Sequence, residues 1–457
     1  MSAFAELSIS GRVATATDPD WDEARAAWNL AADQHPEAVA FVESADDVAN
    51  VVSFAGRRQL KVSGQGTGHG AVALSPLDDT IVIKTERMRR IDIDADRRTA
   101  RVEAGVLAVE LGEAAQRCRA CSLPGSAPDV GVVGYTVGGG LSWLGRRYGF
   151  ACNRVLAIEL VTADGESRRV DADDDADLFW ALRGGGGSYA IVTALHLALL
   201  PIAELYAGAL LLPAELGADA VRAYRDWTAT VPDEVTSIVR FLRPPPLPDV
   251  PEPIRDRPLL TIGAACIASQ AEGEQLIAPL REIGEPIMDT FEQIPAEQLS
   301  RIHMDPEHPV PGLGHHAAIT ELPNEAIDAF VQAAGPEAGS PLLLAELRQA
   351  GGALGRESEN AGALSKLDAD FLMLGIGLPM TAELGTAIAG HLDHLHDAMQ
   401  PWACDGGYLN FAERPCDLDA ILPPETCARL GEIKRRWDPE GMIVANHAVS
   451  PASSQAA

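Results

Sequence analysis

The order of apolar and polar residues in the first half of the chain predicts alternating strands and helices. Short apolar runs are typical of buried strands, whereas apolar residues at every third or fourth position are typical of amphipathic helices. Strands are therefore predicted over residues 38–42, 60–62, 80–84 and 191–200, hairpins over 90–93 with 99–104 and 155–162 with 167–170, and helices over 20–35, 46–57, 109–119 and 177–182. Ser44 stands where the helix 46–57 needs an N-cap. This order is typical of an α/β layer, in which ligand loops lie at strand ends.

Residues 202–400 differ from the first half in their pattern of predicted strands and helices. Apolar strands are predicted over residues 259–267, 341–347 and 371–376, and amphipathic helices near 216–230, 270–282, 324–334 and 383–399. Residues 243–258 (RPPPLPDVPEPIRDRP) lie between two expected strands and contain too many prolines for regular structure. We therefore expect a rigid surface loop there. Strands and helices in comparable number favour an antiparallel sheet with helices on one face.

The chain is organised around one glycine-rich stretch, residues 61–70 (KVSGQGTGHG). A short apolar strand leads into it, and the loop residues are Gly64, Gly66, Thr67, Gly68, His69 and Gly70. Glycines at alternate positions leave no Cβ in the way, so the backbone can adopt positive φ and bring bare N–H groups against a flat or anionic ligand. The spacing differs from the dinucleotide fingerprint, and the residues that follow predict a loop. A histidine in such a loop is by itself more often structural than chemical.

Three further blocks accompany this loop in order along the chain. They are residues 125–140 (GSAPDVGVVGYTVGGG), residues 179–193 (FWALRGGGGSYAIVT), and the pair formed by Tyr408-Leu409-Asn410 and residues 434–439 (KRRWDP). In the first of these blocks apolar residues alternate with glycines, which predicts a chain that lies flat against an extended cofactor. The glycines of the first two blocks suit a pyrophosphate, which must be met by main-chain N–H groups at close range.

With all four blocks present, residues 28 to 447 resemble the FAD-linked oxidases of the berberine-bridge-enzyme-like group, within the vanillyl-alcohol-oxidase superfamily. The middle of the chain matches only loosely. The resemblance implies that His69 carries FAD covalently through the 8α-methyl carbon of the flavin. Many relatives add a second link from a cysteine in a GTCPTVG-like segment, but Ala127 stands at that position here. Attachment through His69 alone is therefore predicted.

The resemblance also implies which other residues contact the cofactor. The backbones of residues 138–140 and 184–187 are expected along the diphosphate and adenosine of FAD, and Ile191 and Val192 at the adenine. The implied FAD-binding residues are Gly64, Gly66, Thr67, Gly68, His69, Gly70, Pro128, Gly131, Gly134, Gly138, Gly139, Gly140, Gly187, Ile191, Val192, Tyr408 and Asn410.

Tyr408 is the candidate catalytic base, because relatives with a Tyr-x-Asn motif project this position toward the isoalloxazine ring. A tyrosine can accept a proton only if its pKa of about 10 is lowered locally. Asn410 would orient Tyr408 or the flavin. Two interpretations stay open: a catalytic base, or a buried aromatic residue with a hydrogen-bonded hydroxyl. If Tyr408 only packs, a carboxylate of the middle domain or His315 is expected to take the proton.

Composition excludes several other classes of function. The formal charge of −30 and the absence of a basic run argue against a nucleic-acid partner. No apolar run approaches the roughly 20 residues of a membrane span, so no membrane partner is expected. Seven cysteines without metal spacing fit reduced thiols and a cytoplasmic location. No metal is predicted at His391, His394 and His396, nor at His315 and His316, because no carboxylate or cysteine completes a site.

Together, these features predict an α+β protein with a two-domain PCMH-type FAD-binding fold. The predicted parts are an N-terminal helical segment (1–35), an α/β FAD-binding domain (36–203), an α+β substrate domain with an antiparallel sheet (204–404), and a C-terminal segment (405–450) that returns to the FAD domain. The tail after Pro451 is expected to be disordered.

The predicted function is that of a flavoprotein oxidase with a small-molecule substrate and O2 as partners. Hydride would pass from an alcohol, sugar or amine carbon to the flavin, and O2 would reoxidise the flavin to yield H2O2. The alternatives are a dehydrogenase that uses another electron acceptor and a drug-binding protein that sequesters its ligand with little turnover. The sequence leaves the substrate open, and it is equally compatible with a monomer and a homodimer.

Overall fold

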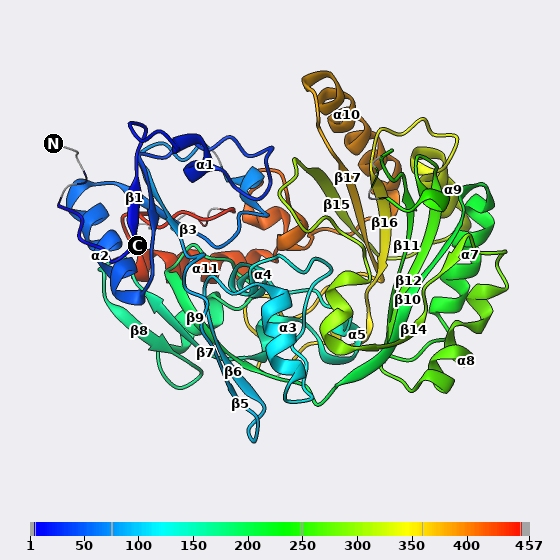
Figure 1. The fold of residues 1–457 in the computed structure, drawn as a ribbon, viewed down its shortest axis with the longest axis horizontal. Helices are drawn as coiled ribbons and strands as arrows, with labels where there is room; N and C mark the ends of the chain where they lie inside the picture. Colours follow the sequence, from blue (N-terminus) through cyan, green and yellow to red (C-terminus); the bar gives the residue numbers. More distant parts are fainter. Residues whose placement is uncertain are drawn as a thin grey trace.

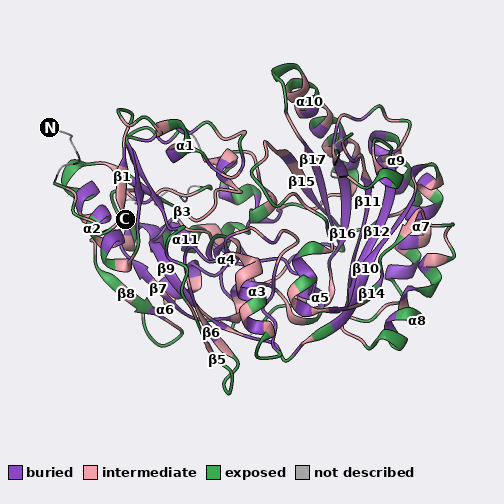
Figure 2. Cartoon of the chain, in the orientation of Figure 1, coloured by how far each residue is buried: buried purple, intermediate pink, exposed green. Residues whose placement is uncertain are grey.

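Two packed halves make up the chain in the computed structural model (Figure 1). The structure describes residues 4, 6–74, 76–246, 248, 250–358, 360–447 and 449. The predicted tail after Pro451 and the end of the predicted C-terminal segment, residues 448 and 450, lie outside them. Two smaller sheets form one half, and a large sheet with its helices forms the other. Most strands lie in the buried interior of the two halves, whereas some edge strands carry half-buried and exposed residues (Figure 2).

A four-stranded sheet carries the glycine-rich stretch. Its strand order is β1-β2-β4-β3, with β1 Arg12–Ala14, β2 Ala38–Phe41, β4 Thr80–Lys84 and β3 Lys61–Gln65. The strands β2, β4 and β3 are parallel neighbours, and β2 and β4 are apolar and fully buried. Helix α2 (Ala45–Arg58) connects β2 to β3 and begins at Ser44, whose side chain accepts a hydrogen bond from the N–H of Asp47. The predicted strand–helix–strand unit and its cap are confirmed.

A five-stranded antiparallel sheet completes the first half. Its order is β5-β6-β9-β7-β8, with β5 Ile91–Asp94, β6 Thr99–Glu103, β9 Ile191–Ala198, β7 Val155–Val161 and β8 Ser167–Val170. The strand pairs β5–β6 and β7–β8 are the two predicted hairpins. The helices of this region are α3 Ala108–Gln116, α4 Val132–Val137, α5 Gly145–Tyr148 and α6 Ala176–Ala181.

The second half is an eight-stranded sheet, antiparallel throughout, as predicted for this region. Its order is β13-β10-β12-β11-β16-β17-β15, and β14 also pairs with β10. The bounds are β10 Glu204–Pro213, β11 Val235–Leu242, β12 Leu259–Cys266, β13 Met288–Asp289, β14 Glu292–Pro295, β15 Leu313–Ile319, β16 Leu344–Gln349 and β17 Phe371–Gly377. The helices α7 Gly217–Thr228, α8 Gln270–Arg281, α9 Asn324–Ala334 and α10 Ala382–Met399 share one apolar core with the sheet and cover one face (Figure 1). The opposite face turns toward the first half.

The C-terminal residues return to the first half, where α11 (Pro424–Trp437) lies beside the smaller sheets (Figure 1). Lys434 anchors this return, because its Nζ donates to the backbone oxygens of Ser188 (2.6 Å) and Ile443 (2.8 Å) and to Asp438 Oδ2 (2.6 Å). The segment then adds to the four-stranded sheet, since Val62 and Ile443 form a parallel bridge. Short 3-10 turns lie at 71–73, 151–154, 214–216, 252–254, 296–301, 352–355, 400–402, 409–411 and 418–420.

The predicted helix over residues 20–35 is wrong in its length. Helix α1 spans only Trp21–Arg25, and Ala26 is already extended with ψ 137°. The next residues bond to the glycine loop instead, because the N–H of Trp28 donates to the backbone oxygen of Thr67 (2.9 Å). Tertiary hydrogen bonds to that loop outweigh the helical spacing of the apolar residues.

Two further expectations need correction. Residues 125–140 do not lie flat throughout, because residues 132–137 form helix α4, in which the apolar side chains Val132, Val133 and Val137 are buried. The strands β1, β10, β13, β14 and β15 were not predicted. The proline-rich residues 243–258 do run between two strands, β11 and β12, with one 3-10 turn at 252–254.

Candidate functional site

The glycine loop follows directly from β3, which ends at Gln65. Gly68 has φ +89°, and a Cβ there would lie 2.8 Å from the Cβ of Ala27, so both backbone angle and space require glycine. Among the described residues, no hydrogen-bond acceptor faces the backbone N–H groups of residues 66–70. A run of unpaired N–H groups in a glycine-rich loop forms a concave donor surface for an anion such as a phosphate.

His69 lies in this loop with a polar group near each ring nitrogen. Nδ1 is 2.8 Å from Thr67 Oγ1, and Nε2 is 3.3 Å from Asp129 Oδ1. The ring of Trp28 stacks on the imidazole, with 3.8 Å between centroids and 16° between planes. The Trp28 indole N–H donates to the second carboxylate oxygen, Asp129 Oδ2, at 2.5 Å. Residues that are distant in sequence thus meet around His69.

Residues 125–140, the second glycine block of the chain after the loop of residues 61–70, lie against both that loop and the C-terminal Tyr-x-Asn motif. A Cβ on Gly131 would lie 3.6 Å from Thr67, and a Cβ on Gly138 would collide with the Asn410 side chain. Gly139 has φ +126°, and a Cβ there would lie 2.9 Å from the Tyr408 ring. The predicted residues of the first loop, this block and the Tyr-x-Asn motif are therefore brought together. Close packing explains these glycines without a ligand.

Several glycine N–H groups of the second and third blocks have backbone partners within the protein. The N–H groups of Gly138 and Gly139 donate to the backbone oxygens of Gly134 (3.3 Å) and Thr136 (3.0 Å) at the end of α4. In the third block, Gly184 and Gly186 both donate to Val137, at 2.9 and 3.1 Å, and Gly185 donates to Ala181 at 3.0 Å. These five N–H groups hold the protein's own backbone, and the contact of residues 138–140 and 184–187 with a diphosphate stays a prediction.

The remaining predicted cofactor residues surround the same region. Gly64 lies in β3 beside Ile191 at the start of β9, where a Cβ on Gly64 would meet the Ile191 side chain at 3.6 Å. Val192 follows it in β9 and is buried. Gly187 lies near Ala445, and Gly70 packs against the side chain of Asn446, so the returning C-terminal segment borders the loop as well. Gly134 lies within α4, and Pro128 is buried before it.

Tyr408 is buried, with 1% of its surface exposed. Its hydroxyl oxygen accepts hydrogen bonds from the Leu141 N–H (2.7 Å) and from Asn410 Nδ2 (3.1 Å), and Asn410 Nδ2 also donates to the backbone oxygen of Tyr135 (2.8 Å). Burial raises the pKa of Tyr408 above its ordinary value, although the hydrogen bonds from Leu141 and Asn410 oppose this. The base interpretation requires a lowered pKa, so this geometry fits the second interpretation, in which Tyr408 and Asn410 hold the backbone of residues 135–141.

A charged cluster that the sequence reasoning missed lies on the face of the large sheet opposite its helices. Arg240 of β11 is the register partner of Glu346 of β16, and Arg348 follows two residues later on the same face. Glu346 is fully buried and accepts from Arg348 Nε at 2.8 Å. A signal for this cluster was present, because charged residues interrupt the apolar stretches TSIVRFL and LLLAELRQA. Charges at such positions are costly unless they are paired.

His303 completes this cluster. Its Nδ1 is 2.5 Å from Asp305 Oδ1 and its Nε2 is 2.6 Å from Glu346 Oε2. Arg240 donates to the backbone oxygen of His303 at 2.8 Å. Burial raises the pKa of Glu346, but attraction to Arg348, His303 and Arg240 outweighs burial and leaves the pKa lowered. Glu346 is therefore ionised and fully compensated.

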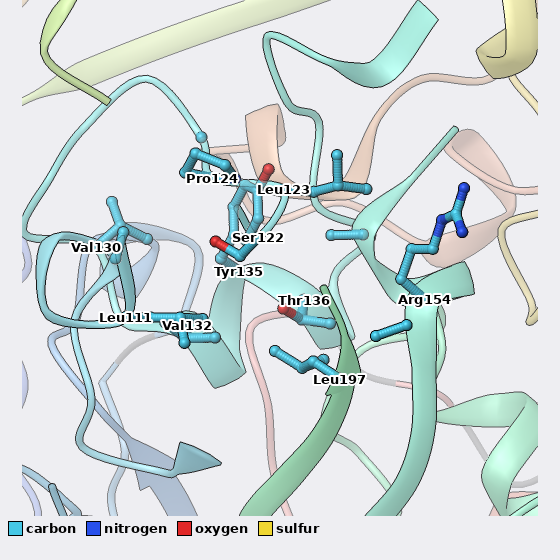
Figure 3. Close-up of a pocket in the computed structure, with 14 residues that line it drawn as sticks. Leu111, Ser122, Leu123, Pro124, Val130, Val132, Tyr135, Thr136, Arg154 and Leu197 are labelled. Atoms are coloured by element: carbon cyan, nitrogen blue, oxygen red, sulfur yellow. The ribbon is translucent and has the colours of Figure 1, made fainter. Parts of the chain in front are cut away.

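Two cavities lie near these elements. A small one beneath the second glycine block is lined mainly by apolar groups, including Leu111, Val132 and Leu197, with the ring of Tyr135 at its side (Figure 3). A larger one of about 790 Å3 lies between β15 and residues 403–424. His315, His316 and Glu413 line it. Burial raises the pKa of Glu413 to about 7, and burial lowers the pKa of His315 to about 4.

The histidine-rich part of α10 shows no metal-binding geometry. His391 Nε2 bonds to the Ala333 oxygen at 2.8 Å, whereas the ring of His396 stacks on His315 at 4.2 Å. Within the described ranges, no group of three or more histidine, cysteine, aspartate or glutamate side chains could hold a metal ion. None of the helices in the described part of the chain combines the length and apolar character that a membrane crossing needs.

Comparison with known sequences places a flavin domain where the glycine loop lies. The family described as FAD binding domain matches residues 36–171. A match to the uncharacterized FAD-linked oxidoreductase YgaK of Bacillus subtilis (strain 168), 29% identical, spans 52% of this chain and about half (53%) of that protein. The (R)-6-hydroxynicotine oxidase of Paenarthrobacter nicotinovorans is 26% identical over 98% of both chains.

Solved structures share the fold over nearly the whole chain. The structure of 6-hydroxy-D-nicotine oxidase from Arthrobacter nicotinovorans superposes with a TM-score of 0.83 at 24% identity, covering 98% of this chain and 99% of that chain. The glucooligosaccharide oxidase from Acremonium strictum, described with a 6-S-cysteinyl, 8α-N1-histidyl FAD, has a TM-score of 0.81 at 20% identity, covering 96% and 97%. The predicted α+β FAD-oxidase fold is confirmed.

Proposed function

The chain belongs to the FAD-linked oxidoreductases of the berberine-bridge-enzyme-like group, and from this premise we propose that it is an oxidase that carries FAD covalently on His69. The observation that carries the proposal is the loop of residues 66–70, whose N–H groups face no acceptor among the described residues. A buried or half-buried donor without a partner is costly, so such a run is expected to bind an anion. The diphosphate of FAD is an anion of suitable size.

The described residues fit the flavin in two further respects. Tyr135 Oη, His69 Nε2 and Asp129 Oδ1 are buried polar atoms without a hydrogen-bond partner in the described structure. Gly68 has φ +89° and no room for a Cβ beside Ala27, so the loop keeps the bare backbone that an anion site requires. Residues 66–70 would therefore hold the diphosphate, and Ile191 and Val192 would border the adenine. FAD, when bound, supplies a hydride acceptor that O2 can reoxidise.

Covalent attachment through His69 alone is the finer part of this proposal. Covalent attachment needs a neutral imidazole as its nucleophile, and His69 is the imidazole that the glycine loop carries. Ala127 offers no sulfur for a second link. A histidyl and cysteinyl FAD in the glucooligosaccharide oxidase supports the chemistry at the histidine position.

The substrate is proposed to be a small molecule that loses hydride from an alcohol, sugar or amine carbon. Two relatives, one named for the oxidation of 6-hydroxynicotine and one for that of glucooligosaccharides, support this choice of substrate classes. The proton that leaves with the hydride needs an acceptor. Tyr408 can serve only if substrate and cofactor lower its raised pKa, whereas Glu413 and His315 line the cavity of about 790 Å3 and are the alternative acceptors.

Denaturation of the purified protein tests the covalent link. The yellow flavin is expected to stay with the polypeptide in acid or SDS, and a tryptic digest should contain one flavin adduct, on the peptide that holds His69. His69→Ala should abolish retention. An unmodified His69 peptide from yellow, folded protein would contradict the proposal.

A separate measurement tests the oxidase activity. Release of H2O2 is measured over a panel of alcohols, reducing sugars and amines, followed by anaerobic reduction and reoxidation with O2. Fast reoxidation by O2 is expected. Flavin that is reduced by a substrate but reoxidised by O2 only slowly would identify a dehydrogenase instead.

A further inference from the structure

The carboxylate of Asp129 faces the imidazole ring of His69. Its Oδ1 lies 3.3 Å from His69 Nε2, and its side chain is 16% exposed beside a histidine that is 21% exposed. Both of these atoms are buried, and neither has a hydrogen bond in the described structure. A carboxylate oxygen and an imidazole nitrogen are thus held face to face, away from solvent, slightly beyond hydrogen-bond length.

Two contacts of Trp28 and two backbone hydrogen bonds fix this arrangement. The Trp28 indole N–H donates to Asp129 Oδ2, so the carboxylate cannot rotate away without losing that bond. The Trp28 ring stacks on the His69 ring, so the same residue positions both partners. The backbone on either side of Asp129 is held by α3, because the N–H groups of Ala108 and Val109 donate to Val130 (2.9 Å) and Pro128 (2.9 Å).

The chemistry of imidazole decides what such a carboxylate does. A neutral imidazole carries its proton on one nitrogen and its lone pair on the other, and a neighbouring carboxylate favours the proton on the nitrogen that faces it. A proton on His69 Nε2 leaves the lone pair on Nδ1. Thr67 Oγ1, 2.8 Å from Nδ1, can then donate its hydroxyl hydrogen to that lone pair. Both contacts favour the same tautomer.

We propose that Asp129 is the positioning residue for flavin attachment, which holds the proton of His69 on Nε2 and so presents Nδ1 to the flavin. This inference rests on the proposed covalent link. In the attachment, the Nδ1–C8α bond forms, one C–H bond of the 8α-methyl group breaks, and the Nε2–H proton is lost toward Asp129. The two electrons pass to O2, which takes up two protons and leaves as H2O2.

Attachment kinetics of the full-length chain test the proposal. The chain is produced in flavin-limited cells and mixed with FAD, and the covalent adduct is followed by intact mass and by flavin fluorescence in SDS gels. Non-covalent binding is measured separately from the change in flavin absorbance. The variants are Asp129→Asn, which keeps the shape but removes the charge, and Asp129→Glu, which keeps the charge. Trp28→Phe keeps the stacked ring but removes the N–H donor.

Glu307→Gln is the matched control, because Glu307 is a neighbouring carboxylate whose charge acts on Asp129 while its own bonds go to Arg301. It removes one negative charge from this region without touching His69. An exposed ion pair contributes little, so attachment in the control should stay within about twofold of wild type.

Asp129→Asn is expected to bind FAD normally but to attach it about 100-fold more slowly. A decrease of this size is expected when a proton-transfer partner is lost. Asp129→Glu should recover most of the rate, and Trp28→Phe should fall between. The adduct should be on Nδ1, as read by NMR of the isolated flavinyl peptide.

Each contrary outcome has its own meaning. A wild-type chain that forms no adduct overturns the covalent link and this inference with it. A wild-type chain that forms the adduct while Asp129→Asn keeps the same rate overturns only the role of Asp129. An adduct on Nε2, or an Asp129→Asn variant that fails to bind FAD at all, also overturns it, because a positioning residue acts on attachment and not on binding.

Discussion

Two histidines of this protein, His69 and His303, face carboxylates in opposite ways. Both ring nitrogens of His303 are at hydrogen-bond distance from carboxylate oxygens, of Asp305 and Glu346, and the side chain is 4% exposed. In His69, Nδ1 has the Thr67 hydroxyl as its partner, and Nε2 lies 3.3 Å from Asp129 Oδ1 without a hydrogen bond. Carboxylates thus occupy both ring nitrogens of His303, whereas one ring nitrogen of His69, Nε2, is buried without a hydrogen bond in the described structure.

The contrast gives a rule for the buried polar groups of this chain. A group whose hydrogen-bonding capacity is filled by the protein itself stabilises the structure, and a group that is buried but unfilled is a candidate for ligand chemistry. Tyr408 resembles His303, since Leu141 and Asn410 occupy its oxygen. Glu413 resembles His69, since its Oε2 is buried without a partner in the described structure.

The largest effect is expected from exchanging the two histidines for alanine. His69→Ala should abolish flavin retention in SDS while the apoprotein folds, because the Asp129 carboxylate that faces His69 keeps its hydrogen bond from Trp28. His303→Ala should destabilise the fold, but every folded molecule that survives should retain covalent flavin. The ratio of adduct to folded protein, from mass spectrometry and circular dichroism, separates the two. Loss of the adduct in folded His303→Ala protein would break the comparison.

Glu346→Gln should lower stability by about 3–5 kcal/mol, because removing one partner leaves buried Arg348 and Arg240 uncompensated. Glu307→Gln is the control, since Glu307 pairs with Arg301 at the surface (2.8 Å) and should cost at most about 1 kcal/mol. Urea unfolding of both flavin-loaded variants measures the difference. Equal losses would mean that the charged cluster is not tightly packed.

Glu413→Gln should stabilise the protein at pH 8 and change little at pH 4. The folded pKa of about 7 lies above the ordinary value of about 4.3, so the folded state holds a proton that the unfolded state releases between these values. Wild-type stability should therefore fall as pH rises from about 4 to about 7 and then level off. The gain for the variant is expected to be about 1–3 kcal/mol at pH 8. Thermal midpoints at several pH values test this, and a gain that does not depend on pH would refute it.

The smallest effect is expected from Tyr408→Phe. If Tyr408 only holds the backbone near Leu141, anaerobic flavin reduction should slow by less than about tenfold, because the two lost hydrogen bonds, at about 1 kcal/mol each, stabilise the fold and take no part in proton transfer. If Tyr408 is the base, reduction should slow by about 10²–10⁴-fold and lose its pH dependence. Stopped-flow reduction with a substrate from the H2O2 panel distinguishes these outcomes.

Local patterns predicted much of the first half of the fold. The strand Thr80–Lys84 and the helix after Ser44 were found because their burial pattern, turn residues and cap all agree. The segment 26–35 was predicted wrongly, because its apolar spacing suits a helix but its backbone bonds to the glycine loop. Sequence alone does not contain that partner.

The candidate site divides in the same way. His69 could be predicted because glycines mark the loop around it, and glycine spacing is visible in one stretch of sequence. Asp129 lies far along the chain from His69, and Glu346 meets Arg240 only across two strands. Pairings of this kind are set by topology and register, which local periodicity does not determine.

The segment that carries Tyr408 also has a consequence for solubility. Strand β15 ends the large sheet, and its outer edge would offer free N–H and C=O groups to another chain. Residues 402–404 cover part of that edge, since the N–H of Thr320 donates to Trp402 (3.0 Å) and the N–H of Cys404 donates to Ala318 (2.9 Å). The connection that brings the chain back to the flavin domain therefore also caps a surface prone to strand-to-strand aggregation.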